Sequence, residues 1–362
     1  MLLTGFEVPM QMFSSRLAFR MFFFSILLSG CGQSGPAEQS KAAGSIELTV
    51  GGTTFPETEG ERHWLQFAKQ SALKTEGAIA PKMLIYGQLG SEEQIISALR
   101  RGRIQFANVS AMAISTLVPE SALLYAPFLF ESEAEADFIL DEYLTPVYRE
   151  LLAEQGLHLI TWYEIGFLQV YGKEPLLVPA DAKGRRFRVG AGLAARMFAE
   201  SLNADVIPLG FTDVVAGLQT GLIEAGENAV SLYARSGIAP EAPQLTLTDH
   251  SYGVSMIVVQ KDWWDKQTPE VQQVLNTSFP GIRESRLDVR AESVRDLDNA
   301  KALGITIHVL DSSQRAAWLS AAGGIRDELA DAIGGRSAEI LAVISHGRLA
   351  YQEQAPEAAA AL

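Results

Sequence analysis

Residues 183–228 constrain the fold of this chain more than any other stretch of the sequence. They read as strand, helix, strand, helix and strand in succession, with glycine, proline or polar residues where each element stops. This alternation predicts an α/β fold whose parallel strands are covered by helices on both faces. In open sheets of this kind, ligands bind where strands end and helices begin. We therefore expect a binding site at the ends of these strands.

Two polar residues of this stretch are candidate ligand contacts. Arg188 ends a strand that we expect to be buried on both faces, beside the glycine turn at residues 190–192. Its planar guanidinium can hold a carboxylate through two parallel hydrogen bonds. Asn228 closes the last strand and can donate to the same carboxylate. The alternative interpretations are an arginine paired with an acidic residue and an ordinary turn asparagine.

The same alternation of strands and helices continues on both sides of this stretch. Strands are expected at residues 45–50, 82–86 and 104–109, and crossing strands at 158–163, 166–171 and 246–260. Residues 89–104 are echoed at 209–223, each copy being a glycine turn, a short helix, a capping glycine and a strand. The echo predicts two similar lobes that close around a ligand.

The sequence accordingly predicts a two-lobed α/β fold, in which each lobe is a sheet flanked by helices. Crossing strands and a long helix join the lobes. The expected segments are a signal peptide at 1–30, a tether at 31–44, lobe I at 45–163 with 254–310, lobe II at 164–253, and C-terminal helices at 311–362 that pack on the lobes.

The charge balance limits the partners of this chain. The net charge is -14, and such an acidic surface argues against binding to nucleic acid or to anionic lipid. A small anionic ligand stays compatible with it, because one arginine inside a site outweighs a distant surface field.

The N-terminal sequence has the pattern of a secretory signal. Arg16 and Arg20 precede a short apolar run, and Leu28-Ser29-Gly30-Cys31 follows it. The run is too short to span a membrane. Leu-Ser-Gly-Cys resembles the processing box of bacterial lipoproteins, so we expect cleavage before Cys31 and lipidation of that residue. The alternative is a free cysteine at the end of an ordinary signal peptide.

Motifs of catalysis and of cofactor binding give little support to an enzyme. The five histidines lie far apart, without the spacing of a metal site, and no nucleophile-elbow motif is found. Residues 190–195 match the dinucleotide-binding fingerprint, but the strand that follows ends without the acidic residue that holds a ribose. We therefore expect no catalytic residue, no metal and no cofactor, and we interpret the glycine turn as backbone near a ligand.

Several segments together resemble one family, the solute-binding receptors of tripartite ATP-independent periplasmic (TRAP) transporters of the dicarboxylate-receptor type. The resemblance covers roughly residues 46–345, in the family's order. It rests on Gly87-Gln-Leu-Gly-Ser-Glu, Pro127-Phe-Leu-Phe130, Pro179-Ala-Asp-Ala-Lys-Gly184, Phe187-Arg-Val189, Leu218-Gln-Thr-Gly-Leu-Ile-Glu-Ala-Gly-Glu-Asn228 and Asp249-His-Ser-Tyr252.

The resemblance implies the two-lobed fold of periplasmic binding proteins. It also implies a receptor that binds a small organic acid between its lobes and delivers it to a membrane permease driven by an ion gradient. The family's carboxylate-binding arginine falls on Arg188, and its asparagine on Asn228. We expect Gln88, Phe211 and Tyr252 to line the site. The lipid anchor would hold the receptor at a membrane on the periplasmic side.

One residue departs from the family's pattern. Many members have a second arginine after the crossing strand, where this chain has Leu168. This difference indicates a more apolar or differently anchored ligand. Three other functions stay open: a receptor for an ABC importer, an exported hydrolase, and a structural lipoprotein that has lost its ligand.

Overall fold

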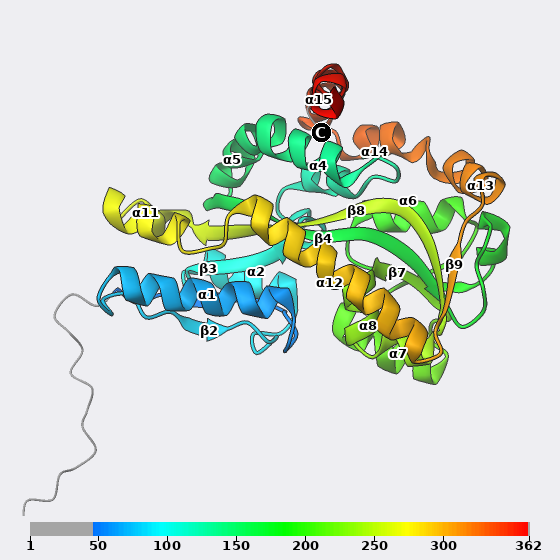
Figure 1. Ribbon diagram of the computed structural model, residues 1–362, viewed down its shortest axis with the longest axis horizontal. Coiled ribbons are helices and arrows are strands. Elements are labelled where there is room, and N and C mark those ends of the chain that lie inside the picture. Colours follow the sequence, from blue (N-terminus) through cyan, green and yellow to red (C-terminus); the bar gives the residue numbers. More distant parts are fainter. Residues whose placement is uncertain (1–45, 361–362) are drawn as a thin grey trace, which may run out of the picture. The chain divides into compact units, whose positions relative to one another are not determined.

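The structure is a computed structural model that describes residues 46–360, with side chains to residue 354. The predicted signal peptide, the tether and Cys31 lie outside the described residues. Within residues 46–360, no helix combines the length and the apolar character that a membrane crossing requires. Figure 1 shows helices on both faces of a central sheet, which confirms the predicted α/β fold.

The elements up to the end of the first long strand are β1 (Thr49–Gly51), α1 (Glu59–Lys74), β2 (Lys82–Leu84), α2 (Glu92–Arg100), β3 (Phe106–Ser110), α3 (Ala111–Ile114), η1 (Pro119–Tyr125), α4 (Glu133–Phe138), η2 (Ile139–Leu144), α5 (Thr145–Glu154) and β4 (Leu157–Gly172). The next are η3 (Pro179–Ala182), β5 (Arg186–Val189), α6 (Leu193–Ser201), β6 (Asp205–Pro208), η4 (Phe211–Asp213), α7 (Val214–Thr220), β7 (Ala225–Ala229), α8 (Val230–Arg235), α9 (Ile238–Glu241) and β8 (Gln244–Gln260). The chain ends with α10 (Lys261–Trp264), α11 (Pro269–Asn276), α12 (Ile282–Ala302), β9 (Thr306–Val309), α13 (Ser312–Ala322), α14 (Ile325–Ile333) and α15 (Ser337–Ala360).

The described strands form one sheet in the order β2-β1-β3-β8-β4-β7-β5-β6, with β9 beside β8. Strands β1, β2 and β3 are parallel to one another, as are β5, β6 and β7. The long strands β4 and β8 pair antiparallel between these two groups. The predicted echo is seen in both groups, because α2 and α7 are each followed by a glycine in the left-handed region, Gly102 and Gly221, and then by a strand.

Strands β4 and β8 are each longer than the sequence indicates. Residues 158–163 and 166–171, expected as two strands, are parts of the single strand β4. Register shifts interrupt its pairing with β8 between Leu159 and Thr161, between Glu164 and Gly166, and between Leu168 and Val170. Each bulge breaks the alternation of apolar and polar side chains, so one long strand looks like two short ones in the sequence.

Strand β9 lies beside the part of β8 that we expect in lobe II. It pairs with residues Gln244 to Leu247, although the sequence places 305–310 with lobe I. The reason is the length of α12, whose 21 residues carry the chain from one end of the sheet to the other. The strands of both halves form one continuous sheet, so the strand order does not mark where one lobe ends and the other begins. The predicted lobe boundaries therefore stay a prediction.

The helical segment at residues 133–154 is not continuous. Between α4 and α5 the chain makes a π-helical turn, η2. Pro146, at the start of α5, has no backbone N–H to donate to the preceding turn, which favours such a wider turn. The carbonyl of Leu140 then accepts hydrogen bonds from the Thr145 hydroxyl at 2.9 Å and from the Trp162 indole at 3.0 Å.

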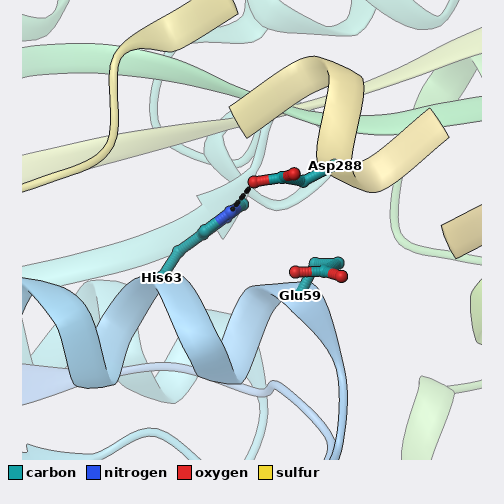
Figure 2. Close-up of side chains that lie close together, drawn as sticks. All are labelled: Glu59, His63 and Asp288. Atoms are coloured by element: carbon teal, nitrogen blue, oxygen red, sulfur yellow. Dashed lines mark hydrogen bonds and ion pairs between the residues drawn. The ribbon is translucent and has the colours of Figure 1, made fainter. Parts of the chain in front are cut away.

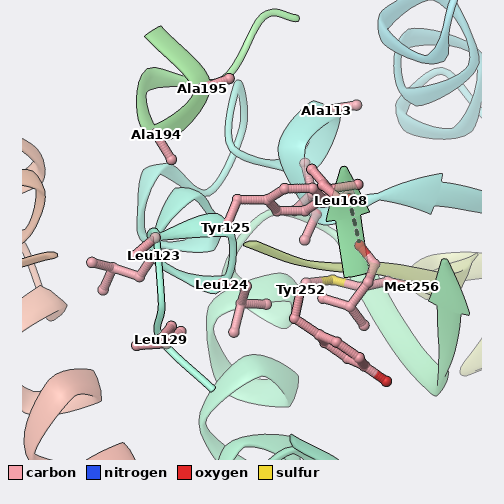
Figure 3. Packing of buried hydrophobic residues seen from close by; sticks show 14 of the residues in the cluster. Ala113, Leu123, Leu124, Tyr125, Leu129, Leu168, Ala194, Ala195, Tyr252 and Met256 are labelled. Carbon is pink, nitrogen blue, oxygen red and sulfur yellow. Dashed lines mark hydrogen bonds between the residues drawn. The ribbon is translucent and has the colours of Figure 1, made fainter. Parts of the chain in front are cut away.

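The apolar cores differ between the two sides of the sheet. One large cluster extends without interruption beneath both halves and contains residues of α2, α5, α6, α14 and α15; Figure 3 shows part of it. Two further clusters are separate. One lies under α1 and α11 and includes Trp64 and Phe67, and the other lies under α7, α8 and α9 and includes Tyr171 and Tyr233.

Helix α12 carries a set of arginines that are paired with acidic residues. Arg290 contacts both carboxylate oxygens of the buried Glu164 on β4 at 3.0 Å, and Asp137 on α4 at 2.8 Å. Arg286 holds Asp141 on η2 in a two-bond pair at 2.6 and 2.9 Å. Near its other end, Asp296 accepts two bonds of 2.8 Å from Arg235 on α8. Ion pairs therefore tie α12 to both halves.

We predict that Arg290→Ala lowers the free energy of unfolding by about 3 kcal/mol, because it leaves the Glu164 carboxylate buried without its cation. Arg295→Ala on the same helix is the matched control. The Arg295 side chain is 55% exposed in its pair with Glu59, so the expected loss is below about 1 kcal/mol. Urea unfolding of the two variants measures the difference, and equal losses would contradict the prediction.

Candidate functional site

Arg188 lies on β5, in the middle of the second group of strands. Its backbone pairs with Ile207 of β6 on one side and with Gly226 of β7 on the other. The residue is only 7% exposed, and its Nε donates to the carbonyl of Leu209 at 2.9 Å. This bond fixes the plane of the guanidinium and leaves its two terminal nitrogens for other acceptors.

No acidic side chain among the described residues forms an ion pair with Arg188. Arg235, Arg286 and Arg290, by contrast, each contact at least one carboxylate. The alternative interpretation of Arg188, an arginine paired with an acidic residue, therefore has no support in this part of the chain. A buried cation without a counter-ion is costly, and an anionic ligand would remove that cost.

Tyr171 of β4 is an aromatic neighbour of Arg188 that the sequence did not indicate. Gly226 pairs with Tyr171 on one side and with Arg188 on the other, so the three residues form one row across the sheet. A Cβ at Gly226 would lie 2.7 Å from Cζ of Tyr171. Glycine is therefore required there for the ring to lie across the strand. The Tyr171 hydroxyl is buried and has no hydrogen-bond partner within the described residues.

Asn228 is two residues beyond Gly226 on β7 and therefore faces the same side of the sheet. Its side-chain oxygen accepts from the backbone N–H of Ala229 at 3.0 Å. The amide nitrogen is thereby left as a donor. Gln169, paired with Asn228, uses both ends of its own amide on Asp249, at 2.7 and 3.0 Å. The amide nitrogen of Asn228 is thus available to donate to a ligand, whereas the Gln169 amide is already used.

Residues of α2 and α3 approach Arg188 from the first group of strands. The Glu92 carboxylate accepts hydrogen bonds from the Ser110 N–H at 2.6 Å and from the Ser110 hydroxyl at 2.7 Å. Burial raises the pKa of Glu92, while the bonds from Ser110 and the charge of Arg188 act against that rise. Arg188 is therefore within electrostatic reach of lobe I.

Met112 of α3 contacts the glycine turn that precedes α6. A Cβ at Gly190 would lie 2.5 Å from the Met112 sulfur, and a Cβ at Gly192 would lie 2.7 Å from its Cγ. The two glycines thus make room for a side chain from the other group of strands. The sequence indicated a turn that brings backbone near a ligand, and the structure adds Met112 as its neighbour.

The other predicted lining residues are placed in three different surroundings. Gln88 is exposed after β2, and its side chain accepts from the Tyr86 N–H at 2.8 Å. Phe211 begins η4 and meets the ring of Phe55 edge to face at 6.1 Å, a contact between the two halves. Tyr252 is buried in the large core against Phe130 and Phe167. No contact of these residues with Arg188 is observed, so their role at the site stays a prediction.

Leu168 lies in the large core rather than at an exposed edge of the site. It pairs with Ala229 on β7 and with Ser251 on β8. Tyr125, also labelled in Figure 3, belongs to the same apolar cluster, and its hydroxyl donates to the carbonyl of Val254 at 3.2 Å. An apolar side chain is consistent with these surroundings.

Glu227, between Gly226 and Asn228, points to the opposite face of the sheet. It contacts His250 Nε2 at 2.7 Å, and Nδ1 of the same ring contacts the Thr248 hydroxyl at 2.8 Å. The imidazole stacks on Phe198 of α6, with ring centroids 4.0 Å apart. This pair supports the sheet from beneath and fixes the orientation of the strand that carries Asn228.

A second group of ionisable residues joins α1 to α12. Glu59, His63 and Asp288 have ligand-type atoms within 4.8 Å of one another (Figure 2). Arg62, however, contacts both carboxylates and lies 3.2 Å from His63 Nε2. The acidic groups thus already have a cationic partner, and His63 Nδ1 contacts the Tyr163 hydroxyl at 3.0 Å. We interpret the group as a contact between helices.

The comparison with protein families identifies the class of this chain. Residues 53–331 match the model of the bacterial extracellular solute-binding protein family 7. The chain therefore belongs to this family, the DctP type of TRAP solute-binding receptors. The result agrees with the resemblance found in the sequence and favours a receptor over an exported hydrolase.

Curated relatives carry the names of periplasmic binding proteins. The 2,3-diketo-L-gulonate-binding protein YiaO of Escherichia coli is 28% identical, over 70% of this chain and 78% of its own. The ectoine-binding protein TeaA of Halomonas elongata is 24% identical, over 71% of this chain and 77% of its own.

Solved structures share the fold. The structure of TeaA from Halomonas elongata gives a TM-score of 0.78 at 21% identity, over 84% of this chain and 100% of that chain. The sugar acid binding protein DctPAm of Advenella mimigardefordensis, in complex with galactonate, gives 0.76 at 23% identity, over 84% and 99%. These similarities confirm the two-lobed fold.

We predict that Gly226→Ala lowers the free energy of unfolding by about 1–3 kcal/mol, because the added methyl group overlaps the Tyr171 ring and neither strand can yield without cost. Gly210→Ala is the control in the same lobe, since a Cβ there has its nearest neighbour at 3.5 Å. Thermal or urea unfolding measures both. A neutral Gly226→Ala variant would show that the row Tyr171–Gly226–Arg188 is not closely packed.

Proposed function

We propose that this protein binds a small organic acid between its two lobes, with Arg188 as the partner of the ligand's carboxylate. The supporting observation is that Arg188 is 7% exposed and has no ion pair to an acidic side chain of the described residues. Its terminal nitrogens are free to hold a carboxylate in the two-bond geometry of guanidinium pairs. The amide nitrogen of Asn228 and the hydroxyl of Tyr171 lie on the same face as further donors.

The ligand we propose has one carboxylate and a body that is apolar or hydroxyl-bearing. Leu168 stands where many family members have a second arginine, and it is surrounded by apolar side chains. A ligand with two carboxylates would therefore find only one of the two arginines that many family members have. Relatives are named for ectoine, for 2,3-diketo-L-gulonate and for C4-dicarboxylates, which gives the range to be tested.

We propose Gln88, Phe211 and Tyr252 as residues that line the site in the ligand-bound protein. The contact between Phe211 and Phe55 supports this for Phe211, because it joins the two lobes at the end of β6. Gln88 follows β2, where the loops of the first group of strands gather. Tyr252 packs on Phe167, which precedes Leu168 in the chain, and we propose that it shapes the site through this contact.

We predict that Arg188→Ala abolishes ligand binding while leaving the fold intact. The test is a thermal-shift screen with monocarboxylates, dicarboxylates, keto acids and sugar acids. A ligand at a hundredfold excess over its dissociation constant stabilises the wild-type protein by about 2.7 kcal/mol. We expect that stabilisation to be lost in Arg188→Ala.

Arg186→Ala is the matched control for this experiment. Arg186 lies on the same strand, but its side chain is 43% exposed and pairs with Glu224. It should therefore retain the ligand's effect. Unchanged affinity in Arg188→Ala would exclude the carboxylate clamp. Stabilisation by dicarboxylates above monocarboxylates would contradict the proposed ligand class.

We further propose that the receptor passes its ligand to a TRAP permease and is held at the membrane by a lipid on Cys31. The family match supports the permease as partner and gives no support to an ABC importer. The lipid anchor rests on the pattern Leu28-Ser29-Gly30-Cys31 alone. It would place the described domain on the periplasmic side, at the end of a tether.

We predict that Cys31→Ser moves the protein from the membrane fraction to the soluble periplasmic fraction, because the thiol is the only attachment point for the lipid. Cell fractionation with an antibody against the protein measures the distribution. Ser34→Ala, three residues later, is the control and should stay in the membrane fraction. A membrane-bound Cys31→Ser variant would exclude anchoring through this residue.

A further inference from the structure

A cavity of about 750 Å³ opens on lobe I, far from Arg188. Its walls come from α5, the start of β4, α10, α11 and the segment that leads into α12. Along β4, Thr161 precedes Gln169, the partner of Asn228, by eight residues, which corresponds to roughly 25 Å of extended chain. The volume is in the range of about 300–1,000 Å³ that small-molecule sites have in proteins. The cavity is therefore separate from the site proposed above and large enough for a ligand.

The polar groups of this cavity are largely unused within the protein. Arg149, His158, Thr161 and Asn276 all line it, and the side chains of these four form no hydrogen bond or ion pair among residues 46–354. Arg149 and Asn276 are exposed, whereas His158 and Thr161 are half-buried. The cavity thus presents a cation and several donors without internal acceptors.

An aromatic wall adjoins these polar groups. The His158 imidazole stacks on the Trp264 indole, with centroids 5.0 Å apart and planes inclined by 16°. Ile160, Phe279 and Ile282 complete the apolar part of the lining. Two stacked rings and aliphatic side chains favour a flat apolar body. The floor is the edge of β4 that faces away from β8, and this edge acquires a strand partner, β7, only from Leu168 onward.

The charges around His158 are positive on balance. Arg149 lies close enough to lower the pKa of the imidazole further, beyond the lowering that burial itself causes. Asp265 acts in the opposite direction and Lys261 in the same direction as Arg149. Asp265 and Lys261 are paired with each other, so their charges nearly cancel. On this side of the cavity the positive charge of Arg149 is therefore left without a compensating carboxylate, and a bound anion would neutralise it.

We propose that this cavity is a second binding site, for a small aromatic carboxylate. The carboxylate would pair with Arg149, the ring would lie against the Trp264 and His158 pair, and Thr161 or Asn276 would donate the remaining hydrogen bond. The site lies entirely on lobe I, so a ligand there does not require the lobes to close. It is independent of the function proposed for Arg188.

The test uses naphthoate as the probe and the histidine ring resonances as the readout. The chain has five histidines, and loss of one signal in His158→Gln assigns His158. We expect naphthoate to shift the His158 signal saturably and to raise the pH midpoint of its titration. Naphthalenemethanol, which has the same ring without the charge, should bind at least tenfold more weakly.

Arg149→Gln should weaken naphthoate binding at least tenfold and remove the change in the titration midpoint. Arg100→Gln is the matched control, because Arg100 is an exposed arginine at the end of α2. Arg188→Ala should leave the shift unchanged, which separates this site from the one between the lobes. The proposal is overturned if millimolar naphthoate gives no saturable shift, if the alcohol binds equally well, or if Arg149→Gln has no effect.

Discussion

The pairing of β4 with β8 is the constraint on which the rest of the structure depends. These two strands run antiparallel to each other through the middle of the sheet, where β8 pairs with β3 of the first group and β4 pairs with β7 of the second. Because each group needs them as neighbours, neither half has a complete sheet without the other. The large apolar cluster that continues beneath both halves follows from this sharing, and the two separate clusters on the other side leave the space across which α12 passes.

Charge is distributed in two different ways over this framework. Along α12, arginines and acidic residues are paired, and they tie that helix to α1, α4, β4 and α8. At the end of β5, Arg188 instead donates to the backbone carbonyl of Leu209 and has no ion pair to an acidic side chain of the described residues. The ion pairs along α12 hold this helix to its neighbouring elements. The absence of an ion pair to Arg188 among the described residues is the observation on which we base its proposed role in ligand binding.

Local sequence patterns are enough to propose two residues of the candidate site. Arg188 and Asn228 follow from a strand, a glycine turn and the start of a helix, all within one continuous stretch. Tyr171 and Met112 could not be found in this way. Tyr171 joins Arg188 only through the pairing of both strands with Gly226, and Met112 comes from a helix seventy-eight residues before Gly190. The bulges in β4 likewise hid one long strand, because each reverses the side that the following residues face.

The position of β8 also determines when this chain can fold. Its residues, Gln244–Gln260, lie between β3 and β4 in the sheet, although β3 ends at Ser110 and β4 at Gly172. The first group of strands therefore lacks its central neighbour until most of the chain has been synthesised. Contacts between residues so distant in sequence slow folding, because a long loop must close before they form. The central pairing of the sheet can therefore be completed only after Gln260 has been synthesised.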